Sequence, residues 1–122
     1  MPGQSILIIE DDESLADLIS MSLKLGGYQS AVAGDGIQAM TMARQLRPAL
    51  IILDFMFPAG GGISAHKRLR TLADTKRTPI IILTSTCEEV VAKAVDMDGN
   101  TYYIGKPYKR GMLMDLIGQI LS

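Results

Sequence analysis

The chain has 122 residues, of which 48% are apolar and 20% are charged, as in an ordinary soluble domain with a buried core. The net charge of −1 argues against direct nucleic-acid binding. No apolar run approaches the roughly 20 residues that span a bilayer, and the start lacks the basic region of a signal peptide. A single cysteine excludes an intrachain disulfide and fits a reducing compartment, so we expect a cytoplasmic protein.

Five short aliphatic runs recur along the chain. They are rich in Ile, Leu and Val and mostly lack the apolar–polar alternation of a half-exposed sheet, so we expect strands that are buried on both faces. The predicted strands are residues 5–9, 29–33, 49–53, 79–83 and 101–104.

The segments between these runs have helical periodicity. Asp12 or Ser14 is expected to cap the first helix. Its predicted inner face consists of Leu15, Leu18, Ile19, Ser22 and Leu23, and that of the second helix consists of Ile37, Met40, Ala43 and Leu46. The remaining helices are predicted after residue 62 to about 72, from 88 to about 97, and after residue 107 to the C-terminus. This alternation predicts a single α/β domain over residues 1–122, a doubly wound (βα)5 parallel sheet with right-handed crossovers.

Polar residues stand at the ends of four predicted strands. The first strand is followed by Glu10 and Asp11, the third by Asp54, the fourth by Thr84, and the fifth leads to Lys106. Each could be an ordinary surface residue if it occurred alone. Because ligands of open α/β sheets bind outside the carboxyl ends of the strands, the joint occurrence favours one shared site.

The three acids of this set suggest the chemistry. Glu10, Asp11 and Asp54 form a cluster of hard oxygen ligands suited to Mg²⁺. A cation there relieves the repulsion between carboxylates and leaves one oxygen able to attack phosphorus, as in proteins that form aspartyl phosphates. Lys106 could neutralise a second phosphoryl oxygen, and the hydroxyl of Thr84 could donate to a third.

At these residues the chain closely resembles the receiver domain of bacterial two-component response regulators, over essentially its whole length. "ILIIEDDE" (6–13) resembles the family's opening strand and acid pair, and "LDFMFPAGGG" (53–62) its phosphoacceptor strand and loop. The segment "AGDGIQAM" (33–40) is similar to the family's second loop and helix, "PIIILTS" (79–85) to its fourth strand with the switch hydroxyl, and "YYIGKPY" (102–108) to its fifth strand with the lysine. The resemblance implies a flavodoxin-like sheet with the strand order 2-1-3-4-5.

The resemblance also implies a role for each acid. Asp54 would be the phosphorylated aspartate, and Asp11 a direct ligand of Mg²⁺, for which Mn²⁺ could substitute. Glu10 would act mainly through water, and the backbone carbonyl of Met56 would be a further ligand. The spacing of the motifs favours Glu10 and Asp11 over Asp11 and Asp12 as the acid pair.

Three further residues would form the switch. Thr84 would be the switch hydroxyl, Tyr103 the aromatic side chain that reorients with it, and Lys106 the ammonium that pairs with the phosphoryl group. A cis-proline type of turn would follow Lys106.

We therefore expect a phosphorylation-controlled binding module, not an enzyme beyond weak self-phosphorylation and self-dephosphorylation. A sensor histidine kinase would donate the phosphate to Asp54. Phosphorylation would then alter the surface that binds an unidentified downstream partner or output domain. Formation of a dimer on phosphorylation is a further form that this response could take. The alternative is a Mg²⁺-dependent phosphatase with an aspartyl nucleophile. Such enzymes usually have an acid two residues past the nucleophile, where this chain has Met56. The chain is expected to be either a stand-alone regulator or the receiver of a longer protein.

The sequence also predicts the exposure or mobility of several residues outside the site. The basic segment 66–77 is expected to be a solvated face, with His66 on the surface. Cys87 is expected to be partly buried and inert. The glycines of residues 59–62 predict a mobile loop, and Gly105 stands where the family commonly has a larger aliphatic residue.

Overall fold

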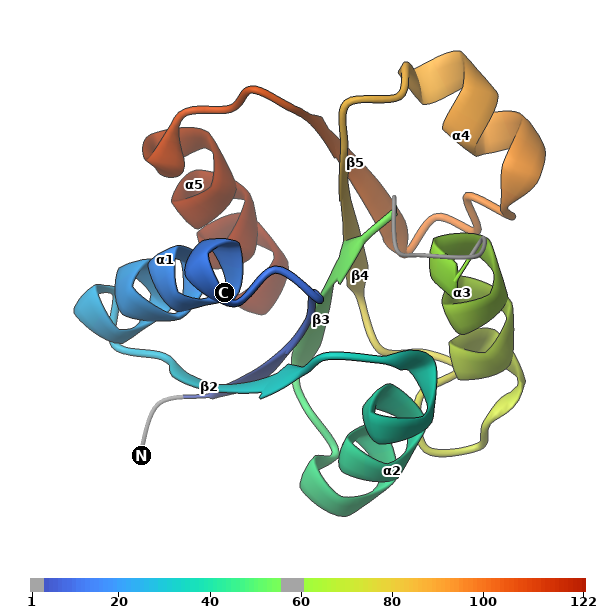
Figure 1. Ribbon diagram of the computed structural model, residues 1–122, viewed down its shortest axis with the longest axis horizontal. Coiled ribbons are helices and arrows are strands. Elements are labelled where there is room, and N and C mark those ends of the chain that lie inside the picture. Colours follow the sequence, from blue (N-terminus) through green and yellow to red (C-terminus); the bar gives the residue numbers. More distant parts are fainter. Residues whose placement is uncertain (1–3, 56–60) are drawn as a thin grey trace.

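The computed structural model describes residues 4–55 and 61–122. Within them, five strands alternate with five helices (Figure 1). The strands are β1 (Ser5–Ile9), β2 (Gln29–Ala33), β3 (Leu50–Asp54), β4 (Ile80–Thr84) and β5 (Thr101–Gly105). The helices are α1 (Glu13–Leu25), α2 (Gly36–Leu46), α3 (Gly61–Thr71), α4 (Glu88–Ala94) and α5 (Arg110–Leu121). None of these described helices is both long enough and apolar enough to cross a bilayer.

The five strands form one parallel sheet in the order β2-β1-β3-β4-β5. This order confirms the doubly wound α/β fold that the sequence and the resemblance predicted. Strands β3 and β4 each lie one residue further along than predicted, so Asp54 and Thr84 are the last residues of their strands. Ladder pairing with Leu83 and with Gly105, respectively, therefore fixes the backbone of these two site residues.

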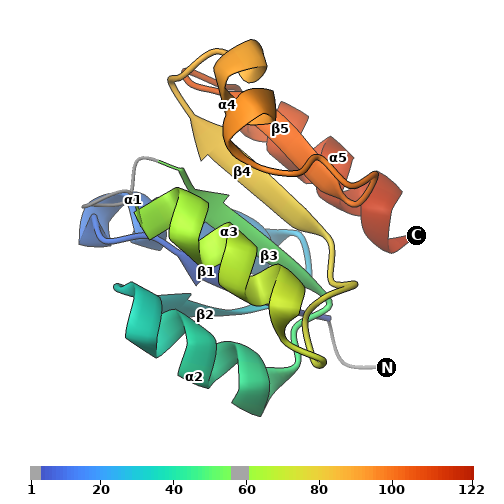
Figure 2. The same ribbon diagram turned by 90° about the vertical axis from the view of Figure 1, so that its right-hand side faces the viewer.

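Helices cover both faces of the sheet. Figure 1 shows α1 and α5 on one side and α2, α3 and α4 on the other, and Figure 2 shows α2 and α3 running side by side across the strands. Each side buries its own apolar cluster. Ile19, Leu23, Leu113 and Ile117 belong to the first cluster, and Ala39, Ala43, Ala65, Leu69 and Val91 to the second.

The buried helix faces differ in part from the predicted ones. Helix α1 buries Ala16, Ile19 and Leu23, whereas Leu18 is 63% exposed. Helix α2 buries Ala39 and Ala43, whereas Ile37 is 79% exposed and Leu46 is 41% exposed. Small alanine side chains let a helix approach the sheet closely, and a pattern of large apolar residues does not reveal this choice of face. The predicted cap of α1 is correct, because Asp12 Oδ1 accepts from the backbone N–H of Leu15 at 3.1 Å.

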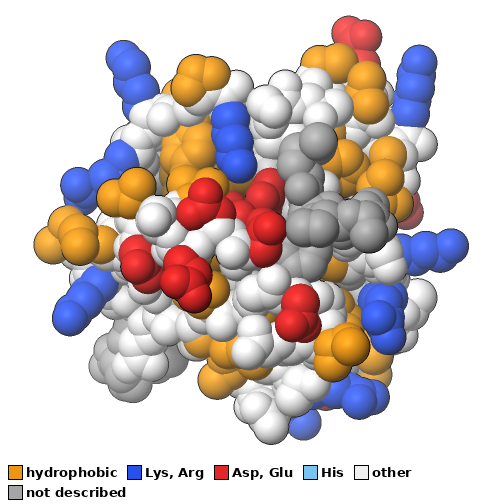
Figure 3. All heavy atoms as spheres, in the orientation of Figure 1, with side chains coloured by type: hydrophobic (Ala, Val, Ile, Leu, Met, Phe, Trp, Pro, Cys, Tyr) orange, Lys and Arg blue, Asp and Glu red, His pale blue; other side chains and the backbone are white. Residues whose placement is uncertain are grey.

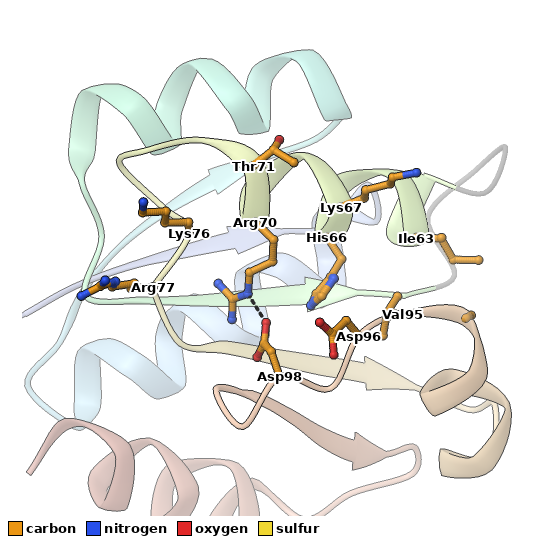
Figure 4. A pocket seen from close by; sticks show the side chains of 11 residues that line it. Ile63, His66, Lys67, Arg70, Thr71, Lys76, Arg77, Val95, Asp96 and Asp98 are labelled. Atoms are coloured by element: carbon orange, nitrogen blue, oxygen red, sulfur yellow. Dashed lines mark hydrogen bonds and ion pairs between the residues drawn. The ribbon is translucent and has the colours of Figure 1, made fainter.

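The basic segment 66–77 is not a solvated face throughout, because Arg70 is directed into the protein (Figure 4). Its side chain is only 12% exposed, and its Nε lies 2.6 Å from Asp98 Oδ2. The other nitrogens donate to the hydroxyl of Thr101 and to the backbone carbonyls of Thr75, Thr78 and Asn100. Arg70 thus ties α3 to the chain before β4 and before β5.

Helix α4 was predicted to extend to about residue 97 but ends at Ala94, because the backbone of Val95 is already extended.

His66 was predicted to lie on the surface, and this was wrong: it is 2% exposed. It lies on the face of α3 that is turned toward the sheet, one turn before Arg70. Its Nε2 is 2.9 Å from Thr101 Oγ1, and that hydroxyl donates its proton to Asp98 Oδ1. Nε2 must therefore be the donor of its bond. Burial lowers the pKa of His66 from the ordinary value of 6.5, and the nearby Arg70 charge lowers it further.

We predict that Arg70→Met lowers the free energy of unfolding by about 1–3 kcal/mol, because several acceptors lose a charged donor. Denaturant unfolding provides the measurement. Arg68→Met is the matched control, because Arg68 lies in the same helix with its side chain exposed, and it should change stability by less than about 0.5 kcal/mol. Equal losses in the two variants would contradict a structural role for Arg70.

We predict that His66 makes the protein less stable as the pH falls. Because the pKa of His66 is lower in the folded state, its contribution is complete above its ordinary pKa of 6.5 and is lost as the unfolded chain takes up a proton below it. From about pH 7.5 to about pH 5.5, unfolding free energies should fall more steeply in the wild type than in His66→Gln. Parallel curves would refute the prediction, since all other titrating groups are common to both proteins.

Candidate functional site

The predicted site residues meet at the carboxyl edge of the sheet. Glu10 follows β1 directly, Asp54 closes β3, Thr84 closes β4, and Lys106 follows β5. Figure 3 shows several acidic side chains gathered near the centre of this face, with a basic side chain beside them. The topology thus brings together residues that are up to 96 positions apart in the chain (106 − 10).

Three carboxylates lie close together here. One oxygen from each of Glu10, Asp11 and Asp54 lies within 4.8 Å of the other two. Glu10 is 3% exposed and Asp54 is 7% exposed, whereas Asp11 faces the solvent. Of the two acid pairs considered from the sequence, the one that lies against Asp54 is therefore Glu10 and Asp11.

The electrostatics of this cluster are unfavourable without a counter-charge. Two carboxylates at 4.8 Å repel by about 3 kcal/mol at an effective dielectric constant of about 20. Burial raises the pKa of Glu10 from 4.5 to about 7, and the Asp54 carboxyl adds to the rise, although the backbone N–H of Asp12, 3.2 Å from Glu10 Oε2, opposes it. At neutral pH the cluster therefore holds a proton for part of the time or requires a cation.

The donor set fits a hard divalent cation. Carboxylate oxygens are the ligands that Mg²⁺ selects, and the exposed side chain of Asp11 leaves one side open for the water ligands that Mg²⁺ retains. The predicted fourth ligand, the backbone carbonyl of Met56, lies outside the described residues.

Lys106 supplies the positive charge of the site. Its Nζ lies 3.5 Å from Asp54 Oδ1, and its side chain is 26% exposed. The backbone N–H of Lys106 donates to the carbonyl of Thr84 at 2.8 Å, which ties the end of β5 to the end of β4. The bond from Lys106 to Pro107 is cis, as the resemblance implied. The ammonium and the two other acids thus surround Asp54 with opposite charges.

Thr84 and Tyr103 are connected through the backbone of Thr86. Thr84 is fully buried, and its Oγ1 accepts from the N–H of Thr86 at 3.0 Å. The Tyr103 hydroxyl donates to the carbonyl of Thr86 at 2.7 Å. This role of the Thr86 backbone was not predicted, because a backbone group can come from any residue type and leaves no signal in the sequence. Cys87, predicted to be partly buried, is exposed.

The start of α3 packs against Phe55, the residue that follows Asp54. A Cβ atom on Gly62 would collide with the backbone of Phe55, so only glycine allows the helix to approach the end of β3 this closely. Phe55 in turn donates its N–H to the carbonyl of Leu83 at 3.0 Å. Gly61 and Gly62 therefore belong to α3, whereas the rest of the glycine-rich segment predicted to be mobile lies outside the described residues.

The comparisons with known proteins agree with this geometry. The family model described as the response regulator receiver domain matches residues 6–118. The DNA-binding response regulator MtrA of Mycolicibacterium paratuberculosis is 42% identical over 106 residues, which are 87% of this chain and 46% of MtrA. The chain thus spans about half the length of that relative.

Solved structures share the fold along the whole chain. The chemotaxis protein CheY4 of Vibrio cholerae superposes with a TM-score of 0.88 at 26% identity, covering 97% of this chain and 98% of that one. The receiver domain of the sensor histidine kinase PA1611 of Pseudomonas aeruginosa PAO1, solved with a magnesium ion in its active-site cleft, gives a TM-score of 0.86 at 32% identity, covering 98% and 99%. The chain therefore belongs to the response regulator receiver domain family.

Proposed function

We propose that this domain is a signalling switch that accepts a phosphoryl group on Asp54 from a sensor histidine kinase in a Mg²⁺-dependent reaction. The observation that carries the proposal is the surroundings of Asp54. Lys106 Nζ lies 3.5 Å from one of its oxygens, and carboxylate oxygens of Glu10 and Asp11 lie within 4.8 Å. Nothing in the described residues or in the relatives favours the alternative of a phosphatase that turns over external substrates.

In the reaction, an Asp54 oxygen attacks the phosphorus of a phosphohistidine. The new O–P bond forms as the P–N bond breaks, and the imidazole leaves with the bonding electron pair and takes up a proton. A bound Mg²⁺ would supply positive charge to the phosphoryl oxygens, held by Asp11 and Asp54 with Glu10 acting through water. Lys106 neutralises a further phosphoryl oxygen from its position beside Asp54.

Thr84 then transmits the structural effect of the phosphoryl group to the surface of the domain. Its hydroxyl accepts a hydrogen bond from Thr86, and a hydroxyl that accepts one bond can still donate another, here to a phosphoryl oxygen. Movement of Thr84 toward the phosphoryl group pulls on the connection between β4 and α4. Since Tyr103 is bonded to the Thr86 carbonyl, the same movement reaches β5. Phosphorylation would thus shift the population of two arrangements of the α4 and β5 surface.

The downstream partner would bind this altered surface. It would be a separate protein or an output domain of a longer chain, and dimerisation on phosphorylation is one form that the response could take. DNA binding is part of the name of MtrA, and we assign no direct nucleic-acid contact to this domain, whose net charge is −1. We place the domain in the cytoplasm.

We predict that acetyl phosphate adds one phosphate to the protein only when Mg²⁺ or Mn²⁺ is present, because the phosphate cannot approach the carboxylates unless a cation neutralises them. Intact-mass spectrometry measures the addition. Asp54→Asn should abolish it, and Asp11→Asn should greatly reduce it.

Asp12→Asn is the matched control for this experiment. Asp12 is an exposed acid next to the cluster, and asparagine can replace it as the cap of α1. This variant should take up phosphate as the wild type does. Equal labelling of Asp54→Asn would place the acceptor elsewhere, and loss of labelling in Asp12→Asn would mean that the acid pair is wrongly assigned.

A further inference from the structure

Gly105 and Tyr103 lie on the same face of β5, since residues two apart in a strand share a face. A Cβ atom on Gly105 would lie 2.9 Å from the Tyr103 hydroxyl oxygen and 3.4 Å from its Cε1 and Cζ atoms. The three atoms nearest to this position thus all belong to Tyr103. Its ring occupies the space that a side chain at position 105 would fill.

The ring is held there by one hydrogen bond and by packing. The hydroxyl donates to the carbonyl of Thr86 at 2.7 Å, and the half-buried ring packs against the apolar cluster on the side of α2, α3 and α4. We define this arrangement, with the hydroxyl on the Thr86 carbonyl, as the inward position of Tyr103. It connects β5 to the segment that follows Thr84.

The role of this glycine is to leave space. Gly27 and Gly99 have positive φ angles, whereas Gly105 does not, so its backbone is open to any residue. An alanine would fit the strand, but its methyl group would meet the Tyr103 hydroxyl. Because that hydroxyl is the far end of a rotatable side chain, the ring would turn away and the sheet would keep its structure.

We propose that Gly105 is a positioning residue of the switch: it leaves the space in which Tyr103 reaches the Thr86 carbonyl, so that the inward position is populated before phosphorylation. The link to phosphorylation rests on the proposed function, whereas the effect on Tyr103 does not. A side chain at position 105 moves the equilibrium of Tyr103 outward. In this chain, the phosphoryl group therefore acts on a loop that Tyr103 already holds.

The size of the effect follows from the hydrogen bond. A typical intramolecular hydrogen bond contributes about 1 kcal/mol, which corresponds to a change in population of about fivefold. The steric contact adds to this. In Gly105→Ala, the ratio of inward to outward Tyr103 should therefore fall by about fivefold or more.

Nuclear magnetic resonance of ring-labelled tyrosine in the unphosphorylated protein tests the proposal. Tyr103→Phe identifies the Tyr103 signal among those of the four tyrosines. Gly105→Ala should move that signal to an outward position. Gly111→Ala is the matched control, because a Cβ atom there would meet nothing within 4 Å, and it should leave the signal in place. An unchanged Tyr103 signal in Gly105→Ala would overturn the proposal.

Thermal unfolding of a double-mutant set gives a second measurement. Gly105→Ala should lower the melting temperature more in the wild-type background than in the Tyr103→Phe background, where the hydroxyl that meets the methyl group is absent. Equal shifts in both backgrounds would contradict the proposal. Phosphate uptake is measured on the same proteins. If neither the wild type nor any variant takes up phosphate, the proposed function fails. The effect of Gly105 on Tyr103 is then still decided by the tyrosine signal.

Discussion

The rest of the site depends on the mutual repulsion of two buried carboxylates. Ile9 and Leu53 are paired in the register of β1 and β3, so the residues that follow them lie at the same level: Glu10 just past the end of β1, and Asp54 at the end of β3. The sheet interior allows neither chain to move away, since every residue of β3, and every residue of β1 except Ser5, is buried. Burial and the proximity of Asp54 raise the pKa of Glu10 to about 7. The fold thus maintains a local excess of negative charge that positive charge relieves.

A series of contacts connects this negatively charged cluster to the neighbouring strands. Lys106 reaches Asp54 from the end of β5, and its own backbone is fixed to Thr84 on β4. Thr84 is in turn bonded to Thr86, whose carbonyl holds Tyr103. A short chain of contacts therefore leads from Asp54 to the carbonyl of Thr86 and to Tyr103 on β5. We propose that the phosphoryl group enters at the buried carboxylate of Asp54, and that these hydrogen bonds are the path by which its arrival moves the surface.

The sequence predicted the sheet and the meeting of the polar residues, but not the contacts that depend on single groups. Runs of Ile and Leu leave few alternatives to buried parallel strands, and the carboxyl ends of such strands must share an edge. The face of α2 could not be predicted, because Ala39 is buried on account of its small side chain, which a pattern of large apolar residues does not reveal. His66 and Arg70 are of residue types that usually lie on the surface. Arg70 is held in its partly buried position mainly by hydrogen bonds to backbone carbonyls, which no residue type reveals. The role of Gly105 likewise could not be predicted from the sequence, because it depends on the position of the Tyr103 ring.

The most direct measurement is the thermal unfolding of the wild type and of Asp54→Asn at about pH 8, with and without Mg²⁺, at constant ionic strength. If repulsion in the cluster is the governing constraint, Asp54→Asn melts higher than the wild type without Mg²⁺, by about 3–5 °C for each kcal/mol of repulsion removed. Added Mg²⁺ should then stabilise the wild type more than the variant. A variant that melts no higher than the wild type, with Mg²⁺ stabilising the two proteins equally, would contradict repulsion between the carboxylates as the governing constraint.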